Sequence, residues 1–208
     1  MSSPATPRER RQERTRQAIV STALKLLVEK GPHKLSLREI ARRIDYSPAG
    51  LYEYFDSKDD LIQAVCDEAD ERLGAALRAV DARLPAGEYL VELGLAYIRF
   101  ARQNPEHFTF LFTRREVEAP EQPVNADEFD TGNSFMVLYN AVRRAIDAGV
   151  IRTGEGYGLM EIAYSLWSIV HGAALLQTNS LYQFPLDFQA IDRKALQVYL
   201  QGLGQERI

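Results

Sequence analysis

The sequence predicts an all-α protein with a three-helix helix-turn-helix head at its N-terminus and a larger helical body behind it, about nine helices in all. Apolar residues recur at helical spacing in one segment after another along the 208 residues, and Gly or Pro separates most of these segments. Two short helices joined by a tight turn are expected near residue 36. A chain of this length can bury a sizeable core, so we expect one large or two small domains.

The first helix of the head is expected from Thr15 to Lys30, where Gly31 and Pro32 end it as C-cap and helix breaker. Its apolar side chains share one face, namely Ile19, Ala23, Leu26 and Leu27. This face should pack against the two short helices that follow and complete the three-helix head.

The second helix is expected to begin at a capping box, in which the Ser36 hydroxyl and the Glu39 carboxylate each bond one unpaired amide of the helix start. One face of this helix is apolar and contains Leu37, Ile40, Ala41 and Ile44. The other faces carry Arg38, Arg42 and Arg43. The helix should therefore be short, amphipathic and basic.

A third helix should follow at once, because Pro48 disfavours the α conformation at Ser47 and is tolerated as the first residue of a helix. Ser47 then serves as its N-cap, and Leu51 and Phe55 can pack back onto the second helix. The residues expected to face outward are Ala49, Gly50, Tyr52, Glu53 and Tyr54. Such a helix can enter the major groove of DNA, where small residues allow close approach to base edges and Lys58 can reach a flanking phosphate.

Three runs here, LSLREIA at 35–41, SPAGLYEYF at 47–55 and SKDDL at 57–61, together resemble the tetracycline-repressor (TetR) family of transcriptional regulators. The resemblance covers residues 15–61 by motif. The run LWSIVHG at 166–172 also resembles the WHG-containing C-terminal subtype of that family. A helical hairpin with a basic solvated face, inside some other all-α domain, is the alternative interpretation of the same runs.

The resemblance implies phosphate contacts from Ser36, Tyr52, Tyr54 and Lys58, and base-facing positions for Arg38, Ala49 and Gly50. Ser47 joins this candidate DNA-binding set as the cap of the third helix. Tyr54 stands where the founding member of the family has His, although Tyr is common there in relatives. Glu53 is unusual on such a surface and could either accept a hydrogen bond from a cytosine amino group or repel DNA.

The charge is distributed unevenly, although the formal net charge is only −4. Residues 1–55 contain 11 Lys and Arg against 6 Asp and Glu, whereas the remainder contains 14 against 23. The positive end is the one with the DNA-binding motif, and its Arg-rich start could reach a phosphate or the minor groove. The single Cys66 and the absence of a secretory signal in MSSPATPRERRQERTRQ favour the cytoplasm.

Residues 1–58 are expected to form the DNA-binding domain with its basic arm, and residues 59–208 the effector-binding and dimerisation domain. Helices of the body are expected at about 58–80, from the break at 84–87 to Asn104, and at 105–114, 134–148, 157–178 and 188–201. Residues 114–132 are acidic, contain two prolines and should form a long loop. In the family, the helix that follows the head moves as a lever when the body binds a small molecule, which changes the separation of the two heads in a dimer.

An effector pocket could be framed by aromatic and polar side chains of the body, although any single one of them is better explained as core. The candidates are Tyr97, His107, Phe108, Phe112, Met136, Tyr139, Tyr164, Trp167 and His171, with Gln177 as a further polar group. The helices at about 157–178 and 188–201 are apolar enough for a four-helix homodimer interface. The first of them contains Glu161, His171 and Gln177, which favours a soluble helix over a membrane span.

Other classes of protein have less support in the sequence. Di-iron bundles need a Glu three residues before a His, and no His of this chain has one; there is also no phosphate loop, dinucleotide fingerprint or HExxH motif. We therefore expect no enzyme, no metal and no cofactor, with double-stranded operator DNA, a second copy of the chain and an unidentified small molecule as partners. An architectural DNA-binding protein without an effector stays open as an alternative, and DNA release by an effector would discriminate the two.

Overall fold

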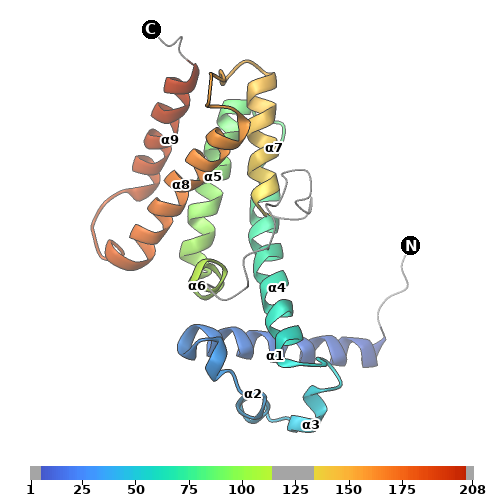
Figure 1. Ribbon diagram of the computed structural model, residues 1–208. Helices are drawn as coiled ribbons and strands as arrows, with labels where there is room; N and C mark the ends of the chain where they lie inside the picture. The colour runs from blue at the N-terminus through green and yellow to red at the C-terminus, as the bar shows by residue number, and fades with distance from the viewer. Residues whose placement is uncertain (1–5, 114–133, 205–208) are drawn as a thin grey trace. The chain divides into compact units, whose positions relative to one another are not determined.

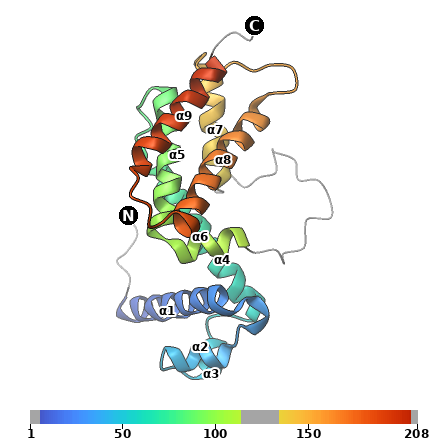
Figure 2. The ribbon, with the colours of Figure 1, turned by 90° about the vertical axis from the view of Figure 1, so that its left-hand side faces the viewer.

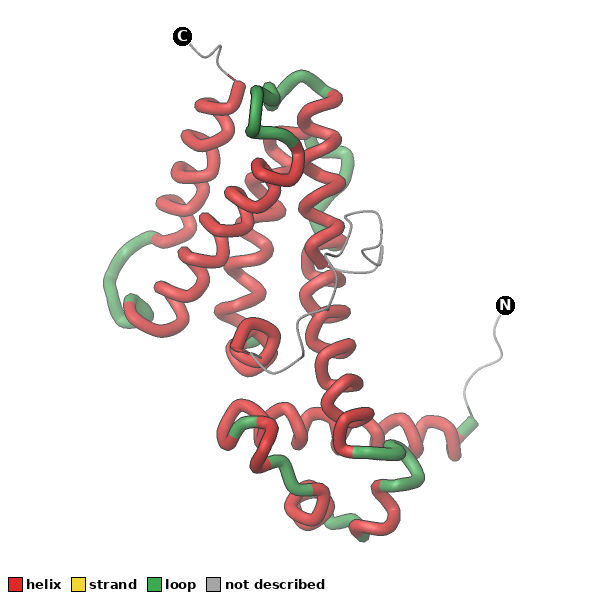
Figure 3. The backbone as a smooth tube through the Cα atoms, in the orientation of Figure 1, coloured by secondary structure: helices red, strands yellow, loops and turns green. Residues whose placement is uncertain are grey.

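The computed structural model describes residues 6–113 and 134–204, which contain nine α-helices and no β-strand (Figures 1 and 3). The all-α prediction is confirmed. The helices are α1 (Pro7–Lys30), α2 (Leu37–Arg43), α3 (Pro48–Leu51), α4 (Lys58–Arg78), α5 (Ala86–Gln103), α6 (Pro105–Thr113), α7 (Ser134–Asp147), α8 (Leu159–Leu175) and α9 (Phe188–Gly204). The loop expected at 114–132 lies outside the described residues.

The chain divides into two compact units. The head contains residues 6–69 together with α6 from Glu106 onward, and the body contains Asp70–Pro105 and the described residues from Ser134 onward. Helix α4 therefore contributes its first half to the head and its second half to the body. This division by packing differs from the functional division predicted after residue 58, because the apolar residues of α4 up to Ala69 belong to the core of the head.

Helix α1 begins at Pro7, eight residues before the predicted start at Thr15. Thr6 caps it in a complete capping box, in which the Glu9 amide donates to Thr6 Oγ1 at 3.2 Å and the Thr6 amide donates to Glu9 Oε2 at 2.6 Å. Pro7 occupies the favourable first position. The Arg-rich residues of the N-terminus are thus helical from residue 7 onward.

The core of the head is built by the apolar faces predicted for its first three helices, joined by α4 and α6. Ile19, Ile40, Leu51 and Leu61 are each at most 1% exposed, and the guanidinium of Arg16 lies 5.3 Å from the centre of the Phe55 ring. These contacts come from four separate helices, so they fix the short α2 and α3 against α1. That anchoring is needed because helices this short are not stable alone.

The body is organised around α5, which packs against α7, α8 and α9 (Figure 2). At Gly94 of α5 the neighbouring helices approach closely: an added Cβ would lie 2.7 Å from Leu196 of α9 and 3.1 Å from Val170 of α8. A glycine at this point lets three helices meet. The hydrophobic contacts of α5 therefore hold the body together.

The helix predicted at 157–178 is divided into α8 and a π-helical turn, η3 (Leu176–Ser180). Thr178 Oγ1 donates to the Ala174 carbonyl at 2.8 Å, and Asn179 Nδ2 donates to the Leu175 carbonyl at 3.1 Å. These side chains take up carbonyl groups in the last turn of α8, which explains why the regular helix ends there. π-helical turns are rare and are frequent at functional sites.

Candidate DNA-contacting surface and effector-binding residues

The turn between α2 and α3 has the geometry that the sequence predicts. Asp45 adopts a positive φ of 54°, and the Tyr46 amide donates to the Ala41 carbonyl at 2.8 Å, which closes the end of α2. Ser47 caps α3, since its hydroxyl accepts from the Gly50 amide at 2.9 Å, and Pro48 is the first helical residue. The predicted cap at Ser47 is confirmed.

The predicted capping box at the start of α2 is wrong. Helix α2 does follow Ser36, but the Ser36 side chain makes no cap hydrogen bond. The carboxylate of Glu39 instead pairs with Lys30 at 2.7 Å and with Arg43 at 3.1 Å. The hydrogen bond and charge of Lys30 lower the pKa of Glu39, with smaller lowering contributions from Arg43, while desolvation of the carboxylate acts in the opposite direction. Because Glu39 forms these ion pairs, its carboxylate does not bond the start of α2, and the Ser36 hydroxyl is left for other contacts.

Gly50 does not face outward as predicted but is buried. A Cβ at this position would lie 2.5 Å from Cε1 of Tyr46, because the Tyr46 ring covers it. Tyr46 also meets Tyr54 edge-on, with ring centres 6.2 Å apart, and Tyr54 is half-buried. Gly50 therefore allows an aromatic pair to brace α3.

The other candidate DNA contacts lie at the surface of the head. Arg38, Ser47, Ala49 and Glu53 are exposed, and Tyr52 is 57% exposed. Ser36 on one side and Lys58 on the other are half-buried. The exposed set comes from the α2–α3 pair and from the turn that follows it, which are the parts of a helix-turn-helix that approach DNA.

Sequence reasoning missed a basic hollow on the head. It measures about 350 Å³ and is lined by Arg11, Arg14, Thr15, Ala18, Ile44 and Tyr46. Both of its arginines lie in the part of α1 before Thr15, where the sequence predicted no helix. The Thr6–Pro7–Glu9 capping signal could have revealed that helical extension.

In the body, three of the candidate effector residues form a chain of hydrogen bonds. Trp167 Nε1 donates to Tyr97 Oη at 3.2 Å, and Tyr97 Oη lies 2.9 Å from His171 Nδ1. Because the Tyr97 oxygen accepts from Trp167, its own proton is best placed to go to a neutral His171. Burial raises the pKa of Tyr97 and lowers the pKa of His171, so both groups are held neutral.

Phe135 of α7 extends this aromatic cluster, with its ring centre 5.7 Å from that of Trp167 and 6.4 Å from that of Tyr139. Met136 of the same helix is half-buried. We call Tyr97, Phe135, Tyr139, Trp167 and His171 the aromatic cluster. The sequence analysis proposed Tyr97, Tyr139, Trp167 and His171 for the pocket, but not Phe135.

The remaining effector candidates are placed elsewhere. Tyr164 is 64% exposed on α8. His107, Phe108 and Phe112 belong to α6 in the head, where the two Phe rings lie 5.0 Å apart and His107 Nε2 lies 3.9 Å from Glu68 Oε1. The list from the sequence therefore draws on both compact units.

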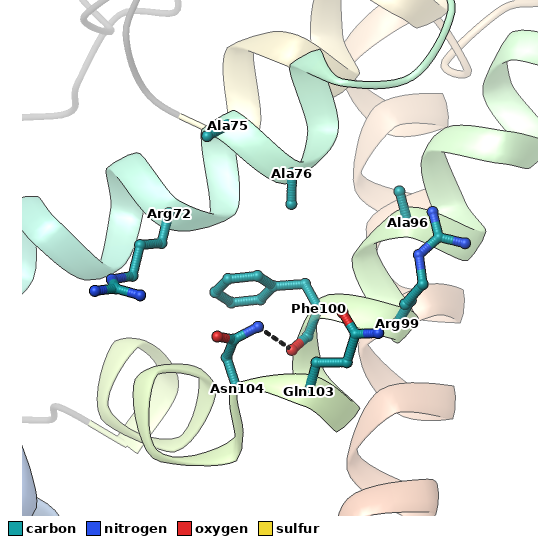
Figure 4. Close-up of a pocket in the computed structure, with 8 residues that line it drawn as sticks. All are labelled: Arg72, Ala75, Ala76, Ala96, Arg99, Phe100, Gln103 and Asn104. Carbon is teal, nitrogen blue, oxygen red and sulfur yellow. Dashed lines mark hydrogen bonds between the residues drawn. The ribbon is translucent and has the colours of Figure 1, made fainter.

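A polar hollow of about 250 Å³ in the body was not predicted from the sequence (Figure 4). Figure 4 shows the Phe100 ring facing Ala75 and Ala76 of α4, with Arg72 and Arg99 on opposite sides of the view. Gln103 and Asn104 complete the lining, and Asn104 Nδ2 donates to the Phe100 carbonyl at 3.2 Å. Two guanidinium groups beside an aromatic floor could hold an anion that has an apolar part.

Comparisons with known proteins cover both units. Residues 19–65 match the family of bacterial regulatory proteins of the tetR type, and residues 90–199 match the tetracyclin repressor-like C-terminal domain. An uncharacterized HTH-type transcriptional regulator of Mycobacterium tuberculosis is 27% identical over 172 residues, which are 80% of this chain and 72% of the relative.

Solved structures agree on the fold. A TetR family transcription regulator from Marinobacter aquaeolei is 19% identical with a TM-score of 0.73, and the match covers 91% of this chain and 96% of that one. A protein of unknown function from a Rhodococcus species is 24% identical with a TM-score of 0.72, covering 91% and 95%.

Proposed function

Because the chain belongs to the TetR family and is a DNA-binding transcriptional regulator, we propose that it is a homodimeric repressor that a small molecule releases from a roughly palindromic operator. Regulators of this family bind operator DNA as dimers and are soluble, cytoplasmic proteins. The family indicates a regulator rather than an enzyme. The WHG subtype of the C-terminal domain stays a prediction.

The DNA contacts that we propose start from the Ser47-capped turn, which is the observation that carries the assignment. With α3 braced by the Tyr46–Tyr54 pair, the exposed Arg38 and Ala49 face bases, while Ser36, Tyr52 and Lys58 contact phosphates. Arg11 and Arg14 extend the phosphate contacts along α1. Glu53 is exposed beside these residues. Its carboxylate repels the DNA backbone unless a cytosine amino group pairs with it, so it disfavours sequences that lack such a cytosine.

The dimer interface that we propose is the exposed apolar surface of α8, η3, the segment after it and α9. Within the described residues it contains Met160, Tyr164, Leu175, Leu176, Tyr182, Phe184, Leu186, Ile191 and Val198, which are between 37% and 67% exposed. One stretch, Leu159–Ser180, is long and apolar enough to cross a membrane, and only 28% of its most apolar window is buried within one chain. A second copy of the chain would cover this surface, as expected of an obligate interface.

Gly172 supports this interface, because a Cβ added to it would meet nothing within 4 Å among the described residues of its own chain. The lack of a side chain there is not required by the body and would let a partner helix approach closely. Replacing Gly172 with Leu should therefore convert the dimer to a monomer without loss of helix content, as measured by native mass spectrometry and circular dichroism. Asn140→Leu, at an exposed position of α7, is the matched control and should remain dimeric.

The effector-binding part of the proposal rests on the hydrogen-bonded chain Trp167–Tyr97–His171, which places polar groups inside an aromatic surround. Two-fold symmetry predicts operator half-sites about one helical turn apart, ~34–36 Å. Binding at the aromatic cluster would favour a packing of α4 whose head separation no longer matches them.

Native mass spectrometry of the purified protein tests the proposal, followed by titration of a protein–operator complex with any molecule found or selected by ligand screening. A dimer that releases DNA when the effector is added, and that does so less well after Trp167→Phe, supports it. A monomer would overturn the symmetric-operator argument. Binding to DNA that no effector changes would instead favour the architectural alternative.

A further inference from the structure

A second hollow of the body lies between α5, η3 and α9 and measures about 330 Å³. It is lined by Leu95, Ile98, Arg99, Arg102, Gln103, Gln177, Gln189 and Asp192, none of which belongs to the aromatic cluster. The volume falls at the lower end of the ~300–1,000 Å³ typical of small-molecule sites and far exceeds the ~30 Å³ of one water molecule. The hollow therefore has room for a small organic molecule.

Gln177 places a buried polar group with an unused acceptor in the lining of this hollow. Its side chain is 6% exposed, and its Nε2 donates to Asp192 Oδ2 at 2.8 Å. Its Oε1 is buried and has no hydrogen-bond partner among residues 6–113 and 134–204. A buried acceptor is rarely left unpaired, because burial removes its hydrogen bond to water and no protein hydrogen bond replaces it. Gln177 also lies on the π-helical turn η3, a feature frequent at functional sites.

The lining of the hollow contains one buried carboxylate and two exposed guanidinium groups. Asp192 is 8% exposed, and burial raises its pKa, while the hydrogen bond from Gln177 and the charge of Arg102 act in the opposite direction. Arg99 and Arg102 are exposed and form no hydrogen bond or ion pair with the described part of the chain. A buried acceptor pair thus stands beside two guanidinium groups, with Leu95 and Ile98 as the apolar wall.

We propose that this hollow binds a small zwitterion of the amino-acid type with an aliphatic side chain. Its ammonium group would donate to Gln177 Oε1 and face the Asp192 carboxylate. Its carboxylate would pair with Arg99 and Arg102, and its side chain would cover Leu95 and Ile98. This site is separate from the aromatic cluster and does not rest on the proposed effector there.

Three probes with one carbon skeleton test the proposal by isothermal titration calorimetry on the full-length protein. L-leucine carries both charged groups, 4-methylpentanoate lacks the ammonium, and 3-methylbutylamine lacks the carboxylate. Leucine should bind saturably, and each analogue should bind about tenfold more weakly or worse, because charge-assisted hydrogen bonds are lost. Arg102→Met and Gln177→Met should each weaken leucine by a similar factor, whereas Trp167→Phe should leave its affinity unchanged.

Arg102 is exposed, so its variant keeps the test valid even if Gln177→Met does not fold. Absence of leucine binding to the wild type overturns the proposal. Equal binding of 4-methylpentanoate would also overturn it, because the Gln177–Asp192 pair would then recognise nothing. Leucine binding that persists in both variants would place the molecule elsewhere and would refute the site.

Discussion

The two serines of the helix-turn-helix provide a matched pair for testing the structure of the head. Ser47 Oγ accepts from the Gly50 amide at 2.9 Å, whereas Ser36 caps nothing. Ser47→Ala should therefore lose a helix cap and lower the free energy of unfolding by about 1 kcal/mol. Ser36→Ala removes a half-buried hydroxyl that makes no cap hydrogen bond, and should change the free energy of unfolding by less than about 0.5 kcal/mol.

Thermal unfolding monitored by circular dichroism separates these two expectations. In a chain of ~200 residues, the Ser47→Ala loss corresponds to a melting-temperature decrease of roughly 2–4 °C. The Ser36→Ala change should stay below half of that. If Ser36→Ala destabilises the protein as much as Ser47→Ala does, the Ser36 hydroxyl caps α2 in solution and our account of the Glu39 ion pairs is incorrect.

In DNA binding we expect the opposite order for the two serine variants, with the larger effect from Ser36→Ala. Ser36→Ala removes one proposed phosphate contact and should weaken binding to a duplex about tenfold or more, since a hydrogen bond to a charged group contributes ~1.5–3 kcal/mol. Fluorescence anisotropy with a labelled duplex at fixed salt measures this. Wild-type affinity in Ser36→Ala would remove Ser36 from the contact surface.

Three further predictions concern contacts and protonation. Lys58→Ala should weaken all duplexes about equally and reduce the slope of log affinity against log salt by about one; Lys194→Ala, on α9, should leave that slope unaltered. Arg38→Ala should relax the preference at one position of each half-site, so selection from random DNA that returns the wild-type consensus would exclude a base contact. Burial lowers the pKa of His171, so the unfolded state takes up its proton first, and stability should fall as the pH falls through the unfolded value of about 6.5. Urea unfolding at several pH values should show a weaker acid dependence for His171→Gln, and an identical dependence would mean that His171 does not contribute.

The fold could be read from the sequence because each helix carries a local signal. Gly31 with Pro32 and the Ser47–Pro48 pair fixed the breaks of the head, and the structure ends and begins helices at these residues. The error at α1 has the same origin: a complete capping signal at Thr6 and Glu9 was present, but the charged residues after it have no apolar face. A polar helix stabilised by its cap is invisible to a search for apolar periodicity.

The candidate sites were less predictable because they depend on competition between partners. Glu39 satisfies the capping-box spacing, yet Lys30 is nine residues away in the sequence and holds its carboxylate. Gly50 sits at a position that should face DNA, yet the ring of Tyr46 turns back over it. The Gln177–Asp192 pair joins residues on η3 and α9 that no spacing rule connects. In each case a side chain has several possible partners, and only the three-dimensional arrangement shows which partner it contacts.

Helix α8 is apolar nearly all round, so hydrophobic periodicity alone does not show which of its residues face which surroundings. Its buried residues Leu166 and Val170 face the interior of the body, while Trp167 and His171, each one position later, join the aromatic cluster. Tyr164 and Leu175 are exposed on a third face. Substitutions at neighbouring positions of one helix should therefore produce three different defects, in stability, in effector response and in dimer formation. Under the proposed function all three surfaces lie on one helix, so a ligand that displaces Trp167 would also shift the proposed dimer face and would couple effector binding to subunit arrangement.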